Sequence, residues 1–102
     1  PGLVDAVAAD IEWRGGEGGV LVIEAGASLL ATVRQDGPDT VIEVPGVETT
    51  CLPVAGDVRV ILDGPVLEVA AAGKLFGTAI APWTPPLRVH VTNGTLDVFP
   101  LR

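Results

Sequence analysis

The stretch Asp57-Val58-Arg59-Val60-Ile61-Leu62-Asp63-Gly64-Pro65-Val66-Leu67-Glu68-Val69 decides the fold class of this 102-residue chain. In its first half Val58, Val60 and Leu62 occupy alternate positions, so an extended chain places them on one face. The Asp63-Gly64 dipeptide then supplies the positive φ angle that a tight hairpin requires, and a second apolar run follows. The stretch therefore predicts two antiparallel strands joined by a short turn.

The same alternation of apolar and polar residues continues on both sides of this hairpin. In residues 87–91, aliphatic side chains alternate with Arg88 and His90, and the chain holds 16 Val, 8 Thr and 5 Ile. Only Leu3–Ala9 has a helical composition, and it fits equally a first strand or the end of a linker. Short strands between Gly and Pro turns predict an all-β fold, an antiparallel two-sheet β-sandwich of the jelly-roll or lectin-like kind. Ten strands are expected, near residues 4–12, 19–24, 28–34, 39–44, 47–52, 57–62, 65–71, 75–80, 87–92 and 95–101, and the last five are expected to form a meander.

Charge and apolar content exclude several classes of protein. The 13 acidic and 6 basic side chains give a net charge of −7, whereas a nucleic-acid-binding protein needs a basic face. No apolar run reaches the roughly 18 residues of a membrane helix, so neither nucleic acid nor membrane is expected as a partner. The length predicts a single domain over residues 1–102. Because the chain begins with Pro1 and contains no Met, we interpret it as a fragment or a processed product whose function belongs to something larger.

A single cysteine and a single histidine limit the available site chemistry. Cys51 and His90 cannot build a structural zinc site, which needs four such ligands. Cys51 lies in an expected strand and is predicted to be a buried, inert thiol, while His90 is predicted to face outward. Two acids surround a proline in Asp36-Gly37-Pro38-Asp39, which favours a turn over a calcium loop. The glycine-rich residues 15–19 are expected to be a flexible connection, because no helix follows them to make a phosphate loop. No metal and no cofactor is therefore expected.

Three features follow one another in the second half of the chain. The hairpin turn Asp63-Gly64 leads into a strand with Glu68-Val69, a third strand carries Thr78, and the chain closes on Phe99-Pro100-Leu101. This order, over residues 57–101, resembles the C-terminal β-sandwich module of glycoside hydrolase family 32, the invertases, levanases and other β-fructosidases. Residues 1–56 match that module only in the rhythm of their strands.

The chain departs from the family pattern at two places. The family usually has an aromatic residue after Glu-Val, where this chain has Ala70, and small polar residues after Asp-Gly, where it has Pro65-Val66. These differences indicate a diverged or trimmed member.

The resemblance implies that the catalytic groups lie elsewhere. In the family they belong to an N-terminal five-bladed propeller, in Asn-Asp-Pro and Arg-Asp-Pro motifs and in a Glu next to Cys. None of these motifs occurs here, since Asn93 is followed by Gly and Cys51 is preceded by Thr50. Asp63 and Glu68 are the one pair that would suggest glycoside hydrolysis, and their neighbours fit a structural hairpin instead. No catalytic residue is expected in this chain.

Two functions follow from these observations. The first is a non-catalytic accessory module that packs against the propeller of the same polypeptide and stabilises it. The second is a carbohydrate-binding lectin-like module. Trp83, in a proline-rich loop, and Trp13, next to Arg14, are the candidates for a domain interface or a sugar contact. The alternatives are that Trp83 folds back over its own sandwich and that Trp13 packs in the core. An unrelated standalone adhesion or assembly domain is a third possibility.

Overall fold

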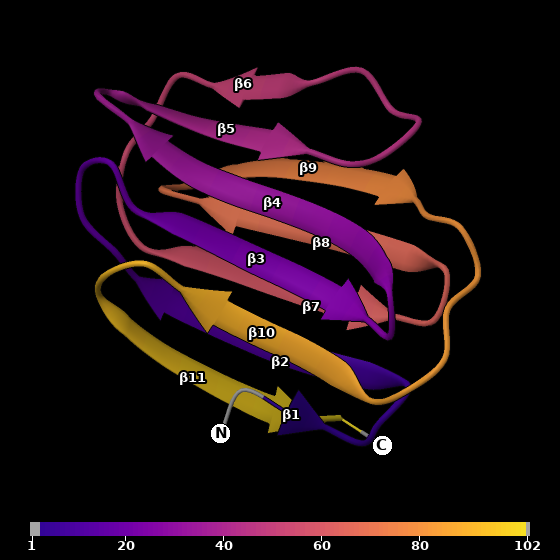
Figure 1. Cartoon of the computed structure of the whole chain (residues 1–102). Coiled ribbons are helices and arrows are strands. Elements are labelled where there is room, and N and C mark those ends of the chain that lie inside the picture. The colour runs from indigo at the N-terminus through magenta and orange to yellow at the C-terminus, as the bar shows by residue number, and fades with distance from the viewer. Residues whose placement is uncertain (1–2, 102) are drawn as a thin grey trace.

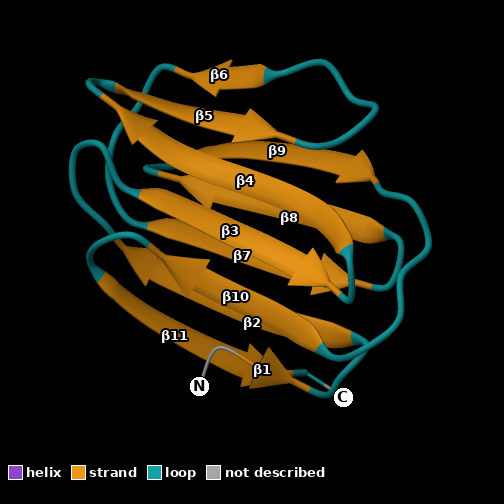
Figure 2. Cartoon of the chain, in the orientation of Figure 1, coloured by secondary structure: helices purple, strands orange, loops and turns teal. Residues whose placement is uncertain are grey.

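The computed structural model describes residues 3–101, which form two antiparallel β-sheets packed face to face (Figure 1). The two-sheet antiparallel β-sandwich expected from the sequence is confirmed. No helix occurs in this part of the chain, so Leu3–Ala9 is not helical; it contains two strand ends joined by residues 5–7 (Figure 2). The strands are β1 (Leu3–Val4), β2 (Ala8–Arg14), β3 (Val20–Ala25), β4 (Ser28–Asp36), β5 (Asp39–Glu43), β6 (Thr50–Leu52), β7 (Val58–Asp63), β8 (Val66–Ala71), β9 (Lys74–Ala79), β10 (Leu87–Val91) and β11 (Thr95–Pro100).

The strands of each sheet follow one another mostly in chain order. The first sheet has the order β1-β10-β3-β4-β5-β6, and the second has the order β11-β2-β7-β8-β9. Tight turns join β3 to β4, β4 to β5, β7 to β8 and β8 to β9, so these neighbours stay in one sheet. Each sheet therefore contains a meander of consecutive strands, β3 to β6 in the first sheet and β7 to β9 in the second.

The first expected strand, residues 4–12, is in fact two strands in different sheets. Leu3 pairs with Arg88 in the first sheet, whereas Ala8 pairs with Asp63 in the second. Residues 5–7 carry the chain across the sandwich between them. Switching sheets within a few residues is one way in which sandwiches close their corners.

The expected meander of the last five strands is wrong. Only β7, β8 and β9 form a meander; β10 returns to the first sheet beside β3, and β11 pairs with β2 in the second. The segment between β9 and β10 contains Pro82, Pro85 and Pro86 and is too long for a tight hairpin. The Asn93-Gly94 dipeptide likewise joins strands of different sheets rather than neighbours in one sheet.

Apolar side chains from both sheets fill the space between them. Burying one such side chain contributes about 2 kcal/mol, so the core supplies most of the favourable free energy of folding. The largest fully buried side chains are Trp13, Ile11, Leu21, Ile23, Ile42, Leu62, Leu67, Leu87, Val33, Val60, Val69 and Val89.

Two buried polar side chains hold the crossing from β6 to β7. Gln35 Nε2 donates a hydrogen bond to the carbonyl oxygen of Gly56 at 2.9 Å. Thr40 Oγ1 donates to the carbonyl oxygen of Val54 at 2.8 Å. These bonds satisfy backbone groups that β-sheet pairing does not reach.

The turn between β8 and β9 carries local backbone strain. Its two residues, Ala72 and Gly73, have φ angles of +45° and +81°. Positive φ at both positions is typical of a type I′ turn, which favours Asn or Gly at the first position. Ala72 has a Cβ atom and no polar side chain to compensate, so this left-handed conformation costs about 1 kcal/mol.

We expect Ala72→Asn to raise the free energy of unfolding by about 1 kcal/mol, because Asn tolerates the left-handed conformation better than Ala does. Ala72 is exposed, so no packing changes. Urea denaturation followed by circular dichroism measures the effect. Ala27→Asn, in the exposed turn between β3 and β4, is the matched control and gives no gain. Equal stabilities of the Ala72→Asn variant and the unsubstituted chain would contradict the prediction.

Candidate functional site

Trp13 lies in the core and not at the surface. Its side chain is 0% exposed, and its Nε1 donates a hydrogen bond to the carbonyl oxygen of Asn93 at 2.9 Å. On β2 it alternates with Ile11, so both side chains point between the sheets. An enclosed ring cannot stack on a sugar or on a second domain. The interpretation of Trp13 as a contact residue is corrected, and its core alternative is right.

The glycines around Trp13 permit close packing. A Cβ atom at Gly15 or Gly19 would overlap the indole of Trp13, and one at Gly94 would overlap the carbonyl group of Arg14. Gly15 and Gly19, within the stretch expected to be a flexible connection, therefore pack tightly against the indole near the end of β2, whereas Gly18 faces open space. Sequence reasoning noted the glycines but missed the ring on which they pack.

Trp83 folds back over its own sandwich. The ring is half-buried against the core, and its Nε1 donates a hydrogen bond to the carbonyl oxygen of Gly64 at 2.6 Å. Gly64 pairs with Val7, just before β2, whereas Trp13 lies near the end of that strand. Six residues of strand span about 20 Å, so the two tryptophans do not form one site. The role of the partly exposed Trp83 ring as a contact residue stays a prediction.

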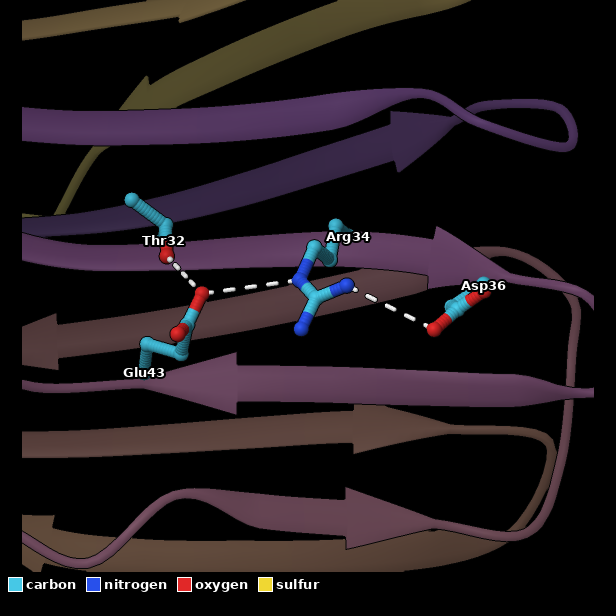
Figure 3. Close-up of polar contacts among 4 residues, drawn as sticks. All are labelled: Thr32, Arg34, Asp36 and Glu43. Carbon is cyan, nitrogen blue, oxygen red and sulfur yellow. Dashed lines mark hydrogen bonds and ion pairs between the residues drawn. The ribbon is translucent and has the colours of Figure 1, made fainter.

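The outer face of the first sheet carries a ladder of paired polar side chains (Figure 3). Thr32 Oγ1 donates to Glu43 Oε1 at 3.3 Å, and Arg34 Nε lies 3.5 Å from the same oxygen. Arg34 Nη1 lies 3.4 Å from Asp36 Oδ2. Exposed pairs of this kind contribute at most about 1 kcal/mol each, which is typical of a solvated face.

The outer face of the second sheet contains a better-defined ion pair. Arg59 Nη2 donates to Asp10 Oδ2 at 2.7 Å and Arg59 Nε to Asp10 Oδ1 at 3.1 Å, a bidentate geometry. The hydrogen bond to Asp10, followed by the charge of Asp10, raises the pKa of Arg59 above its ordinary value. Sequence reasoning missed this pair. The available signal was the position of Asp10, a charged residue inside the apolar run from Ala8 to Ile11. A carboxylate that is only 7% exposed needs a partner of opposite charge.

A shallow hollow of about 440 Å³ lies beside this ion pair, where β2, β7 and β8 end or begin. Two carboxylates, Glu12 and Asp57, and two guanidinium groups, Arg14 and Arg59, line it. Such groups can bond the hydroxyls of a polar ligand. Trp13 also lines the hollow, but it presents no exposed aromatic face there.

Asp63 and Glu68 do not face one another across a sugar site. Asp63 is the last residue of β7, and Glu68 lies on β8, where it pairs with Ile61 and Gly77. Both side chains are exposed on the outer face of one sheet. A glycosidase places its two carboxyls on opposite sides of the scissile bond. The hairpin interpretation of these residues therefore fits the geometry.

Cys51 and His90 lie far apart in the first sheet. Three strands separate β6 from β10, which places them about 20 Å apart. His90 is exposed, as expected, and its Nε2 lies 3.4 Å from Glu24 Oε1.

Cys51 is exposed, so the prediction of a buried thiol is wrong. On the short edge strand β6 its side chain points away from the core. Partial desolvation, then the hydrogen bond to Asp39 and its charge, raise the pKa of the Cys51 thiol above its ordinary value.

Within residues 3–101, no group of three or more His, Cys, Asp or Glu side chains is placed to hold a metal ion. The same part of the chain has no helix long and apolar enough to span a membrane.

Comparison with known proteins gives no match, whether to family models, to curated proteins or to solved structures. The resemblance to glycoside hydrolase family 32 therefore stays a prediction from the residues.

We expect Gly94→Ala to lower the free energy of unfolding by about 3 kcal/mol, because the new methyl group adds overlap with the Arg14 carbonyl to the strain of a positive φ angle. Gly18→Ala is the matched control: Gly18 also has a positive φ, +77°, but faces open space, so the loss is about 1 kcal/mol. Chemical denaturation measures both. Equal losses would contradict the close packing described for this end of the sandwich.

The alkylation of Cys51 by iodoacetamide should have a pH midpoint above that of an ordinary cysteine, because partial desolvation and, after it, the hydrogen bond and charge of Asp39 disfavour the thiolate and raise its pKa. Asp39→Asn removes that charge and should lower the midpoint. The urea-unfolded chain supplies the reference, and mass spectrometry gives the rates. A folded chain with the same midpoint as the unfolded one would refute the effect.

Proposed function

We propose that this chain is a non-catalytic C-terminal accessory module of a glycoside hydrolase family 32 β-fructosidase. In this proposal an N-terminal β-propeller of the same polypeptide hydrolyses sucrose or fructans, and the module packs against the propeller and stabilises it. The observation that carries the proposal is the order of the matching residues: Asp63-Gly64, Glu68-Val69, Thr78 and then Phe99-Pro100-Leu101.

The positions of these residues support a structural role for the motif. They fall on β7, β8, β9 and the end of β11, all within or next to the second sheet. Val69 is 0% exposed and pairs with Phe76, which packs against the core. Glu68 alternates with Val69 and points to solvent. A motif that divides its residues between core and surface in this way serves to build a hairpin.

The arrangement of charged side chains supports the non-catalytic part of the proposal. Glu43 and Asp10, on opposite outer faces, each lie next to an arginine. Asp63 and Glu68, the pair that would suggest hydrolysis, share one exposed surface.

The alternative function is a carbohydrate-binding lectin-like module. The hollow beside Arg59, with its mixture of carboxylates and guanidinium groups, favours it. The burial of Trp13 disfavours it, because sugar sites commonly use an exposed aromatic ring.

Hydrolysis assays test the proposal, and a sugar titration separates it from the lectin-like alternative. The chain of residues 1–102 should release no fructose from sucrose, inulin or levan, while the whole polypeptide that carries it should do so. Reducing-sugar assays on both proteins make the measurement. Titration of the chain with the same sugars, followed by NMR, should leave its amide shifts unchanged. Fructose release by the chain alone would overturn the proposal, and saturable shifts at residues around the hollow would favour the lectin-like alternative.

A further inference from the structure

The outer edge of β9 presents unpaired backbone groups. In an antiparallel ladder, alternate residues point their amide and carbonyl groups toward the neighbouring strand. The amide of Ile80 donates to the carbonyl oxygen of Pro65 at 2.8 Å and so continues the β8–β9 ladder. Residues 74, 76 and 78 therefore bond to β8, whereas Leu75, Gly77 and Ala79 direct their backbone groups to the open edge. Within residues 3–101, the amides of these three have no hydrogen-bond acceptor.

The other sheet edges offer less backbone. β1 has two residues and β6 has three. β11 is as long as β9, but the bond from the Leu101 amide to the Ala8 carbonyl oxygen shows that Pro100, which has no N–H, is among its outward residues. β9 contains no proline, and its single charged residue is Lys74 at the first position. Natural sandwiches protect their edges with charge, proline or short strands, so β9 is the edge left able to accept another strand.

Apolar side chains flank this edge on both faces. Leu75, on the outer face, is 66% exposed, the highest value among the large apolar side chains described. Phe76 points inward and packs against the core, yet it remains partly exposed. A strand placed beside β9 would cover both side chains, and burial of apolar area is favourable.

Glu68 lies beside the open edge with a free carboxylate. It pairs with Gly77 in the β8–β9 register, and a Cβ atom at Gly77 would lie 3.7 Å from its Cγ. In the described part of the chain, its carboxylate makes no hydrogen bond and no ion pair. Gly77 has no side chain to separate Glu68 from a strand on the far side of β9. Two strand spacings are about 10 Å, which matches the combined reach of an Arg and a Glu side chain.

The space beside β9 suits one strand better than a second sandwich. The first sheet has six strands and the second has five, and Figure 1 shows β5 and β6 reaching further out than β9. The same edge of a second copy would bring its own β5 and β6 into the same space. A single extended segment needs only the width of one strand, about 4.8 Å. The occupant is therefore an extended segment rather than a second folded domain.

We propose that the edge of β9 binds an extended segment of another polypeptide as a sixth strand of the second sheet. The segment has Arg or Lys opposite Gly77, where its charge meets Glu68, and apolar residues on either side of that position, which face inward beside Phe76. Main-chain hydrogen bonds to the three outward residues of β9 supply affinity, and the alternate side chains supply specificity. This inference is independent of the proposed function.

The test titrates the chain with the peptide acetyl-Ser-Thr-Val-Arg-Val-Ile-Ser-amide. Binding should saturate and should slow hydrogen exchange, followed by NMR, at the amides of Leu75, Gly77 and Ala79. The amides of residues 74, 76 and 78 already bond to β8 and should change far less. The same peptide with Glu in place of Arg should bind roughly fivefold more weakly, because it repels Glu68. Absence of saturable protection on β9 at millimolar peptide, or protection on another edge instead, overturns the inference.

Charge reversal separates pairing with Glu68 from general attraction to an acidic chain. In Glu68→Arg the preference should reverse, so that the Glu peptide binds more tightly than the Arg peptide. Glu17→Arg, in an exposed loop, changes the net charge equally and is the matched control. It should keep the preference for the Arg peptide. The same preference in both variants would contradict the assigned contact.

Gly77→Pro tests the main-chain hydrogen bonds. Proline removes an amide that faces the open edge and leaves the bonds to β8 intact, so circular dichroism should show a folded sandwich. The variant should lose the peptide-induced protection at residues 75 and 79. Unchanged protection would rule out strand addition.

Discussion

The enclosure of the Trp13 indole between the two sheets is the contact on which the rest of this sandwich depends. Its ring is 0% exposed, and its one polar atom bonds to the backbone of Asn93 in the link between the two sheets. Positions 15, 19 and 94 are occupied by glycine because the ring and the neighbouring backbone leave no room for a side chain. The Trp13 ring therefore requires the glycines at positions 15 and 19, and the backbone of Arg14 and Gly15 requires the one at position 94.

The two outer faces of the sandwich differ in how they meet water. On the first sheet, short-range pairs such as Arg34–Glu43 neutralise the charges locally, which suits a face that stays in solvent. On the second, the bidentate Asp10–Arg59 pair lies beside exposed apolar side chains near the chain ends.

The strands could be predicted from the sequence because the period of two is a local property of the chain. The hairpin from Asp57 to Val69 and the outward His90 follow directly from it. Sheet membership could not be predicted in the same way: residues 5–7 and 80–86 move the chain between sheets, and pairing over such separations leaves no local signal.

Cys51 was misjudged because β6 is a three-residue edge strand, in which alternation alone does not tell the inner face from the outer. Trp13 shows the opposite case. Its alternation with Ile11 did indicate the core, and its neighbour Arg14 suggested a sugar contact only because the two lie side by side in sequence.

The bond between Trp13 and Asn93 can form only late in synthesis. It joins residues 80 positions apart, and β2 gains its partner β11 only at the C-terminal end of the chain. During synthesis the early strands of this sandwich therefore wait, with one edge unpaired and their apolar faces in water, until residues 95–100 have emerged. For a nascent chain so rich in valine, this interval is the period of greatest exposure to aggregation, and it makes early chaperone contact with the N-terminal strands valuable.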